Sequence, residues 1–237
     1  QVFGMKKVGV ALKEGDFSLD MDAMLQAIDT YSPALVFIAS PNNPTANRLD
    51  DGNLEIICTH APGLVVLDEA YYRFAGNSRV SEVADIENLV VLQTMSKIGL
   101  AALRVGVLFG SEDWVDVIDR LRMPYNISTI SQAGARFAIE HESAFQLQIE
   151  AITDERQDLF DRLEHLEGIS PWPSTTNFIL FRTISGAADQ IFESLKRQNV
   201  LVKNVSGGHP LLQDCLRVTV GTPRENGLFL AALRNSL

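Results

Sequence analysis

Cysteine and histidine are both scarce in this chain of 237 residues. Its two cysteines, Cys58 and Cys215, are far apart and do not have the spacing of a metal site. This pattern favours a reduced, cytoplasmic protein over a disulfide scaffold. The four histidines also lack ligand spacing, so we predict no metal centre. They are His60, His141, His165 and His209.

Basic residues are in the minority, with 20 Lys and Arg against 30 Asp and Glu and a net charge of −10. Because a phosphate backbone requires a basic patch, we expect no nucleic-acid partner. No apolar run approaches the ~20 residues of a membrane span, and no signal peptide is recognisable. Hydrophobic residues make up 46% of the chain, so a sizeable core is available. We expect a globular protein that has no membrane partner.

One lysine, Lys97, follows an apolar run at residues 89–92 that is typical of a buried strand. A serine and a glycine then break the pattern. Lys97 should therefore lie just beyond the carboxyl end of a strand, where open α/β sheets bind ligands. A lysine there can form a Schiff base with a carbonyl cofactor, and Thr94, Ser96 and Arg104 could hold a phosphate. The same residues could equally form an ordinary solvated loop.

Two earlier apolar runs, at residues 34–39 and 64–67, also end in polar side chains. The first leads to Asn43, and the second to Asp68 and Tyr71. If the three strand ends meet at one edge of a sheet, an amide, a carboxylate, a phenol and a lysine converge. These groups suit pyridoxal phosphate (PLP). The carboxylate keeps the ring nitrogen protonated, and the amide and the phenol can hydrogen-bond the 3'-oxygen of the ring.

The motifs SPNNPT, DEAY, TMSK and ALRVG occur in this order, at residues 40–45, 68–71, 94–97 and 102–106. Together they resemble the PLP-dependent fold-type I aminotransferases of class I and II. Within that family they look closest to histidinol-phosphate aminotransferases. The resemblance covers nearly the whole chain. It implies an α/β fold with a mostly parallel sheet covered by helices, followed by a small C-terminal α+β domain.

The resemblance also implies a role for each site residue. Lys97 is expected to hold PLP and Asp68 to pair with the ring nitrogen. Asn43 and Tyr71 are expected at the 3'-oxygen. The phosphate ligands are expected to be Thr94, Ser96 and Arg104.

The substrate-binding candidates lie further along the chain. Arg217 begins an expected strand in the sequence LRVTVG, where an arginine is commonly structural. The resemblance implies that Arg217, with Asn43, meets the anionic end of the substrate, because a guanidinium fork suits a carboxylate or a phosphate. Lys203 stands where relatives often carry a second arginine, and it keeps the charge without the fork.

By resemblance, the reaction is amino transfer between L-histidinol phosphate and 2-oxoglutarate, within histidine biosynthesis. Related alternatives are an aromatic or broad-specificity aminotransferase and a threonine-phosphate decarboxylase. A non-catalytic PLP-binding module, such as the sensor part of a regulator, is an alternative of another class. A homodimer is expected because relatives complete the site across a dimer interface.

The order of elements predicts three parts: a large PLP-binding domain at residues 1–128, bridging helices at 129–167 and a small domain at 168–237. We expect strands at 8–12, 34–39, 64–67, 89–92, 105–109, 177–181, 200–202 and 216–220. Helices are expected after Asp20, Asp51 and Ser111, over 186–199 and from Thr222-Pro223 onward. The long helix from 129 should break near His141, and Pro171-Trp172-Pro173 should stop it.

The sequence departs from the usual family text in two loops and in its length. Ala46 follows Thr45 where glycine is common, which should stiffen that turn. The loop from Lys97 to Arg104 looks one residue short. Family members run to about 350 residues, so ~110 residues are expected to precede this segment. Those residues would supply part of the phosphate cup and an aromatic that stacks on the ring, and apolar surface should be exposed here.

Overall fold

Three of the expected apolar runs form neighbouring parallel strands in the computed structural model, which describes residues 4–237. They are β1 (Leu35–Ala39), β2 (Leu64–Asp68) and β3 (Leu89–Thr94), and β4 (Gly106–Phe109) joins β3 antiparallel. The order in the sheet is β1-β2-β3-β4. Ala39 pairs with Asp68, and Asp68 pairs with Leu92. The carboxyl ends of the three parallel strands therefore meet at one edge.

The apolar residues of this sheet divide between two faces. Helices α1 (Met21–Tyr31) and α2 (Asn53–His60) cover one face and share a core with Val36, Ile38 and Leu67. Asp20 caps α1 as expected, accepting a hydrogen bond from the backbone N–H of Ala23 at 3.0 Å. On the other face, Trp114 of α4 (Glu112–Asp119) covers Val66 and Val90.

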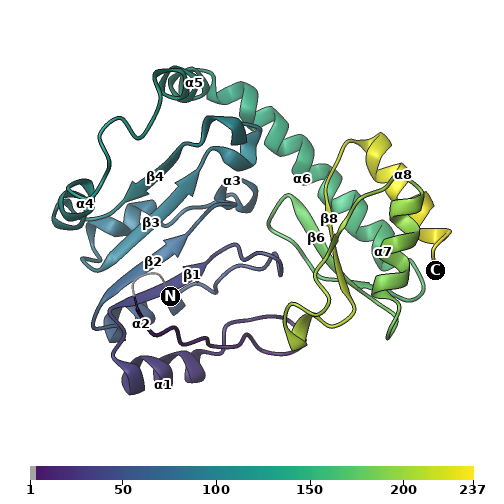
Figure 1. The fold of residues 1–237 in the computed structure, drawn as a ribbon, viewed down its shortest axis with the longest axis horizontal. Coiled ribbons are helices and arrows are strands. Elements are labelled where there is room, and N and C mark those ends of the chain that lie inside the picture. Colours follow the sequence, from purple (N-terminus) through teal and green to yellow (C-terminus); the bar gives the residue numbers. More distant parts are fainter. Residues whose placement is uncertain (1–3) are drawn as a thin grey trace.

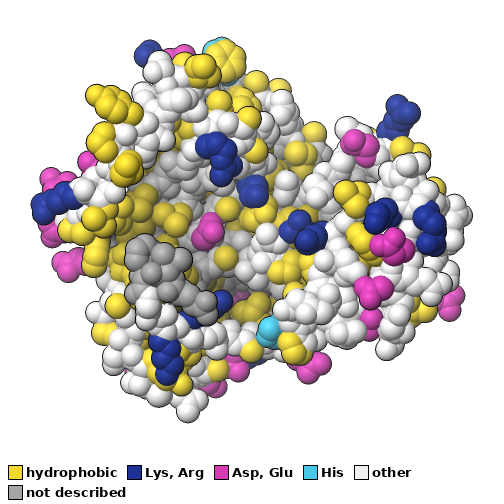
Figure 2. Space-filling model, in the orientation of Figure 1, with side chains coloured by type: hydrophobic (Ala, Val, Ile, Leu, Met, Phe, Trp, Pro, Cys, Tyr) yellow, Lys and Arg dark blue, Asp and Glu magenta, His cyan; other side chains and the backbone are white. Residues whose placement is uncertain are grey.

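That second face is covered only in part within the described residues. Phe37, in β1, is 68% exposed, and Leu35 is 37% exposed. Figure 2 shows hydrophobic side chains gathered on the visible face of this lobe. The exposed apolar surface agrees with the expectation from the sequence.

The second sheet lies in the other lobe, at the far end of two long helices (Figure 1). The helices are α5 (Thr129–Glu140) and α6 (Glu142–Glu164), and they break at His141 as predicted. The sheet has the order β5-β6-β8-β7 and is antiparallel throughout. Its strands are β5 (Ile169–Pro171), β6 (Phe178–Thr183), β7 (Lys203–Asn204) and β8 (Cys215–Thr219).

Helices α7 (Ala188–Arg197) and α8 (Pro223–Arg234) pack with α6 on this sheet around one apolar core. Thr222 and Glu225 form a capping box at the start of α8. The remaining regular segments are α3 (Tyr72–Ala75) and four short 3₁₀ turns, η1 (Val80–Ala84), η2 (Ser96–Ile98), η3 (Ala101–Leu103) and η4 (Pro210–Leu212). No helix in residues 4–237 combines the length and apolar character needed to cross a membrane.

The segment before α1 contacts the small lobe as well as the first sheet, where Leu19 joins the core of β1 and β2. Phe17 is 2% exposed and shares a cluster with Leu180 and Cys215. The indole N–H of Trp172 donates to the carbonyl of Gly15 at 2.6 Å. This contact joins the beginning of the chain to the small lobe.

Two of the predicted strands are wrong. Residues 8–12 form no strand, and Leu12 makes only an isolated bridge to Leu19. Residues 200–202 precede the observed strand β7, and Leu201 is 79% exposed. Both segments are apolar, but the pairing to β8 begins only at Lys203, and residues 8–12 pair at one position alone.

One predicted helix end and one predicted buried side chain also need correction. The long helix ends at Glu164, before the proline pair, and Pro171 is the last residue of β5. The apolar residues of the last helix predict a buried side made of Leu228, Phe229, Ala232 and Leu233. The last three are buried in α8, whereas Leu228 is 57% exposed.

Candidate active site

Asp68 is the last residue of β2, and its side chain is exposed at the edge where the strands end. One carboxylate oxygen, Oδ1, accepts from the backbone N–H of Ala70 at 3.0 Å. The backbone carbonyl of Asp68 accepts from the N–H of Ser40, at the end of β1, at 3.0 Å. Asp68 is thus fixed by its own turn and by the neighbouring strand.

An unbroken row of side chains crosses from the large lobe to the small lobe. The Nζ of Lys97 lies 5.2 Å from the centre of the Tyr71 ring. The Tyr71 ring meets Phe178 edge-on, with 5.3 Å between centroids. The guanidinium carbon of Arg217 lies 4.7 Å from the centre of the Phe178 ring. The structure therefore brings Lys97 and Arg217 to opposite ends of one aromatic pair.

Asn43 completes this row. Its Oδ1 accepts from Nη1 of Arg217 at 2.5 Å, across 174 positions of sequence. With its oxygen engaged by Arg217, the amide has its N–H₂ group left to donate. The structure thus places Asn43 between the predicted cofactor residues and the predicted substrate arginine.

The turn that carries Asn43 is densely hydrogen-bonded. The side chain of Asn42 donates to Thr45 at 2.7 Å, and the hydroxyl of Thr45 donates to Asn47 at 2.5 Å. Ala46 is fully buried and has a φ of 63°, in the left-handed region that favours glycine. The expected stiffness of this turn has a visible cause in that conformation.

The predicted phosphate ligands come together only in part. The hydroxyl of Thr94 donates to that of Ser96 at 2.9 Å and accepts from the Ser96 N–H at 3.0 Å. Arg104 begins the return into β4, but its Nη1 donates to the carbonyl of Ala101 at 3.2 Å. The structure therefore groups the two hydroxyls and leaves the Arg104 side chain in its own turn.

Arg217 and Lys203 are direct cross-strand neighbours in β8 and β7. Side chains that pair in this way leave the same face of a sheet, and like charges directly opposite each other are destabilising. In addition, the Nε of Arg217 is buried and has no hydrogen-bond partner in the described chain. An anion bound between the two cations would remove both costs.

Neither cysteine is a candidate nucleophile. Burial raises the pKa of the Cys58 thiol to about 11, and burial also raises the pKa of Cys215. Both thiols therefore stay protonated and unreactive at neutral pH. The site chemistry rests on the lysine.

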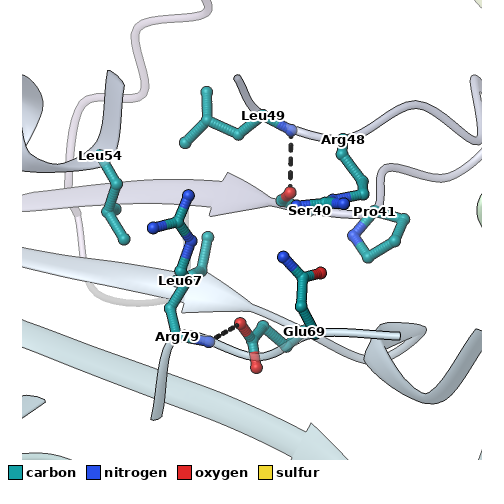
Figure 3. A pocket seen from close by; sticks show the side chains of 9 residues that line it. Ser40, Pro41, Arg48, Leu49, Leu54, Leu67, Glu69 and Arg79 are labelled. Atoms are coloured by element: carbon teal, nitrogen blue, oxygen red, sulfur yellow. Dashed lines mark hydrogen bonds between the residues drawn. The ribbon is translucent and has the colours of Figure 1, made fainter. Parts of the chain in front are cut away.

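The residues present fit PLP by the chemistry of their donors. Asp68 offers a carboxylate to a ring nitrogen, Asn43 and Tyr71 offer an amide and a phenol to a ring oxygen, and Lys97 offers an amine to an aldehyde. Thr94 and Ser96 offer hydroxyls to a phosphate. The hollow drawn in Figure 3 is a separate place behind this site, with a volume of about 20 Å³. Because such a volume has room for one water, it is far too small for a cofactor.

Two features of the site escaped sequence reasoning. Phe178 joins Tyr71 to Arg217, although it reads in the sequence as one apolar residue of a strand. Glu69, inside the DEAY motif, is buried and bonded to Gln93. The only signal for Glu69 is a second charged residue, next to Asp68, after an apolar run.

A family model described as aminotransferase class I and II matches residues 2–233 of this chain. The chain belongs to that family. Members of this aminotransferase family are PLP-dependent, which agrees with the donor set of the site. The family resemblance and the cofactor expected from the motifs are confirmed.

Curated relatives in the same aminotransferase family are similar over almost the whole chain. Histidinol-phosphate aminotransferase 2 of Nitrosococcus oceani is 48% identical over 233 residues, which are 98% of this chain and 64% of that protein. Histidinol-phosphate aminotransferase of Methylibium petroleiphilum is 45% identical over 237 residues, 99% of this chain and 63% of that protein. The chain spans a little less than two thirds of the length of these relatives.

Solved aminotransferase structures share the fold. Histidinol-phosphate aminotransferase from Clostridium acetobutylicum has a TM-score of 0.88 at 20% identity, covering 95% of this chain and 70% of its own. The Sinorhizobium meliloti enzyme, solved in complex with pyridoxal-5'-phosphate, has a TM-score of 0.85 at 25% identity, covering 94% and 62%. The expected fold-type I architecture is confirmed.

Proposed function

We propose that this chain is part of an aminotransferase that moves an amino group between L-histidinol phosphate and 2-oxoglutarate. One observation carries the proposal: the row from Lys97 through Tyr71 and Phe178 to Arg217 and Asn43. It sets an amine at one end and an anion-binding fork at the other. The names of the relatives at 48% and 45% identity support histidinol phosphate as the substrate.

The residues that would hold the cofactor each have a task. PLP, when bound, supplies an electron-withdrawing ring that stabilises negative charge on the substrate carbon. Lys97 would hold the cofactor through Nζ. The same Nζ would take and return the proton of the carbon that carries the amino group. Asp68 would hold the proton on the ring nitrogen, and the Tyr71 phenol would orient the ring.

The other end of the row would hold the substrate. Arg217 presents a planar fork that suits a phosphate bidentately, and Asn43 fixes the orientation of that fork. Lys203 adds a second positive charge opposite Arg217. A phosphate carries more negative charge than a carboxylate, so two cations favour the phosphorylated substrate.

Several wider properties are proposed with this function. We infer a location in the cytoplasm, supported by two buried, free thiols of the kind that persist in a reducing compartment. We also infer a homodimer, which the family resemblance implies. We also keep the functional division into a PLP-binding part at 1–128, bridging helices at 129–167 and a small domain at 168–237. The positions of α5 and α6 between the two sheets support that division (Figure 1).

The test begins with the lysine. Borohydride reduction of the complete protein loaded with PLP, followed by peptide mapping, should place the pyridoxyl group on Lys97. A label on Lys203 or Lys196 would refute the assignment. The same preparation should transfer the amino group of histidinol phosphate to 2-oxoglutarate. Carbon dioxide release from threonine phosphate would instead favour the decarboxylase.

A further inference from the structure

A second carboxylate lies directly behind Asp68. Glu69 is only 2% exposed, whereas the preceding Asp68 is exposed at the edge of the sheet, because successive side chains of extended backbone point to opposite sides. Burying a carboxylate is costly unless it is hydrogen-bonded. No ion pair to Glu69 exists among the described residues. Such a group therefore needs an explanation beyond filling space.

Three neutral donors hold this carboxylate. The hydroxyl of Ser78 donates to Oε2 at 2.6 Å, and the backbone N–H of Arg79 donates to Oε1 at 2.7 Å (Figure 3). The side-chain amide of Gln93 donates to Oε2 at 3.0 Å and to Ser78 at 2.9 Å. Both oxygens of Glu69 are thus fixed from separate segments of the chain.

These donors tie together the two strand ends that carry the site. Gln93 lies in β3 directly before Thr94, and Glu69 directly follows Asp68 at the end of β2. The backbone N–H of Glu69 also donates to the carbonyl of Leu92 at 2.8 Å. The Glu69–Gln93 bond thus joins the residue next to Asp68, the predicted ring-nitrogen partner, to the residue next to Thr94, a predicted phosphate ligand.

We propose that Glu69 is a positioning residue of the PLP site. Through Gln93 and the Ser78–Arg79 turn, it fixes the separation between Asp68 and the segment from Thr94 to Lys97. That separation must match the span of the cofactor from ring nitrogen to phosphate. The inference rests on the proposed function, and it assigns Glu69 no contact with substrate or cofactor.

The alternative is a purely structural carboxylate, which would change stability and nothing else. The variants Glu69→Ala and Glu69→Gln of the complete protein separate the two roles. Alanine removes both acceptor oxygens. Glutamine keeps one oxygen for the Arg79 N–H and can rotate its amide, so it should give an intermediate result. Glu82→Gln is the matched control, because Glu82 binds the Arg79 side chain at 2.6 Å and does not bond the strand ends.

The first measurement is the visible circular dichroism of PLP bound to each variant, which reports how the ring is held. In Glu69→Ala the band should change in shape or sign, and PLP should dissociate faster. The kcat should fall about ten- to a hundredfold, the size expected for a misplacement of about 1 Å. The substrate KM should change little, and the control should match the wild type in all four quantities.

A folded Glu69→Ala protein with the wild-type dichroism band and kcat would overturn the proposal. If Glu69→Ala does not fold, Gln93→Met tests the proposal in its place, because it removes the amide donor and keeps the length of the side chain. The same changes in Gln93→Met support the proposal, and wild-type behaviour overturns it. If the wild-type protein itself binds no PLP at Lys97, the proposed function fails. Wild-type binding with unaffected variants overturns only the role of Glu69.

Discussion

Replacing Arg217 by alanine gives the most direct test of the substrate end of the site. The substitution removes the fork that donates to Asn43 at 2.5 Å and stacks 4.7 Å from Phe178. Because the Nε of Arg217 is buried and unpaired in the described chain, at least one further donor is oriented for a ligand. The loss should fall on binding of the substrate anion.

The magnitude follows from one charge-assisted hydrogen bond. Such a bond contributes about 1.5–3 kcal/mol. At 1.36 kcal/mol per factor of ten, its loss should raise the KM for histidinol phosphate about 10- to 160-fold. Histidinol lacks the phosphate, so its KM should change far less. Arg217→Lys should lie between, because it keeps the charge and loses the planar fork.

Lys203→Ala is the matched control in steady-state assays with both substrates. Its side chain is exposed, and exposed charge pairs are worth about 0.2–1 kcal/mol, so the KM should rise no more than about fivefold. Equal effects of Arg217→Ala on histidinol phosphate and histidinol would show that Arg217 does not bind the phosphate. A larger rise in KM from Lys203→Ala than from Arg217→Ala would show that Lys203, and not Arg217, contributes most to binding the phosphate.

Four further substitutions test other parts of the structure. Asp68→Asn should retain PLP but slow single turnover by at least about thirtyfold, since losing a preorganised charge partner costs ~2–4 kcal/mol of barrier; near-normal rates would refute its role. Thr222→Ala should lower the unfolding free energy by ~1 kcal/mol in a urea titration. Ser111→Ala, at an N-cap that makes no side-chain bond, should cost less. Arg156→Met should cost about 1–3 kcal/mol in the same titration, since two backbone carbonyls lose their donor; unchanged stability would contradict that role.

The strand ends that carry the site were predictable from sequence. Buried parallel strands need apolar side chains on both faces, so the runs at 64–67 and 89–92 are nearly continuous and their ends are sharp. Polar residues directly after such runs must lie at one edge once the strands are parallel. This reasoning placed Asp68 and Lys97 correctly relative to the sheet.

The failures share a physical cause, which is that a strand needs a partner. Residues 8–12 and 200–202 are apolar enough for a strand, yet the first makes only the Leu12–Leu19 bridge, and beside the second β8 pairs with Lys203 and Asn204 instead. Pairing is a tertiary property that local composition does not contain. The direction of the Arg104 side chain was equally hidden, because its φ of 56° turns the chain out of the preceding 3₁₀ segment.

The Glu69 network shows a second limit of sequence reasoning. Within the DEAY motif, the sequence predicts roles only for Asp68 and Tyr71, the first and last residues. Glu69 acts on the opposite side, and its partners Ser78 and Gln93 lie nine and 24 positions away. No local pattern pairs a glutamate with a glutamine at that separation, so only the fold reveals the contact.

The two lobes together define the turn that presents Asn43. Ala46 lies at φ 63°, a conformation that costs a residue with a side chain ~1–2 kcal/mol. Its methyl group is buried beside Phe178, and its carbonyl accepts from both the N–H and the hydroxyl of Thr175 at 2.9 and 3.0 Å. The small lobe therefore offsets the strain of a turn in the large lobe. Because that same lobe carries Arg217, the fork and its Asn43 partner are set by one interface. A change in the angle between the lobes would therefore move Arg217 relative to Asn43.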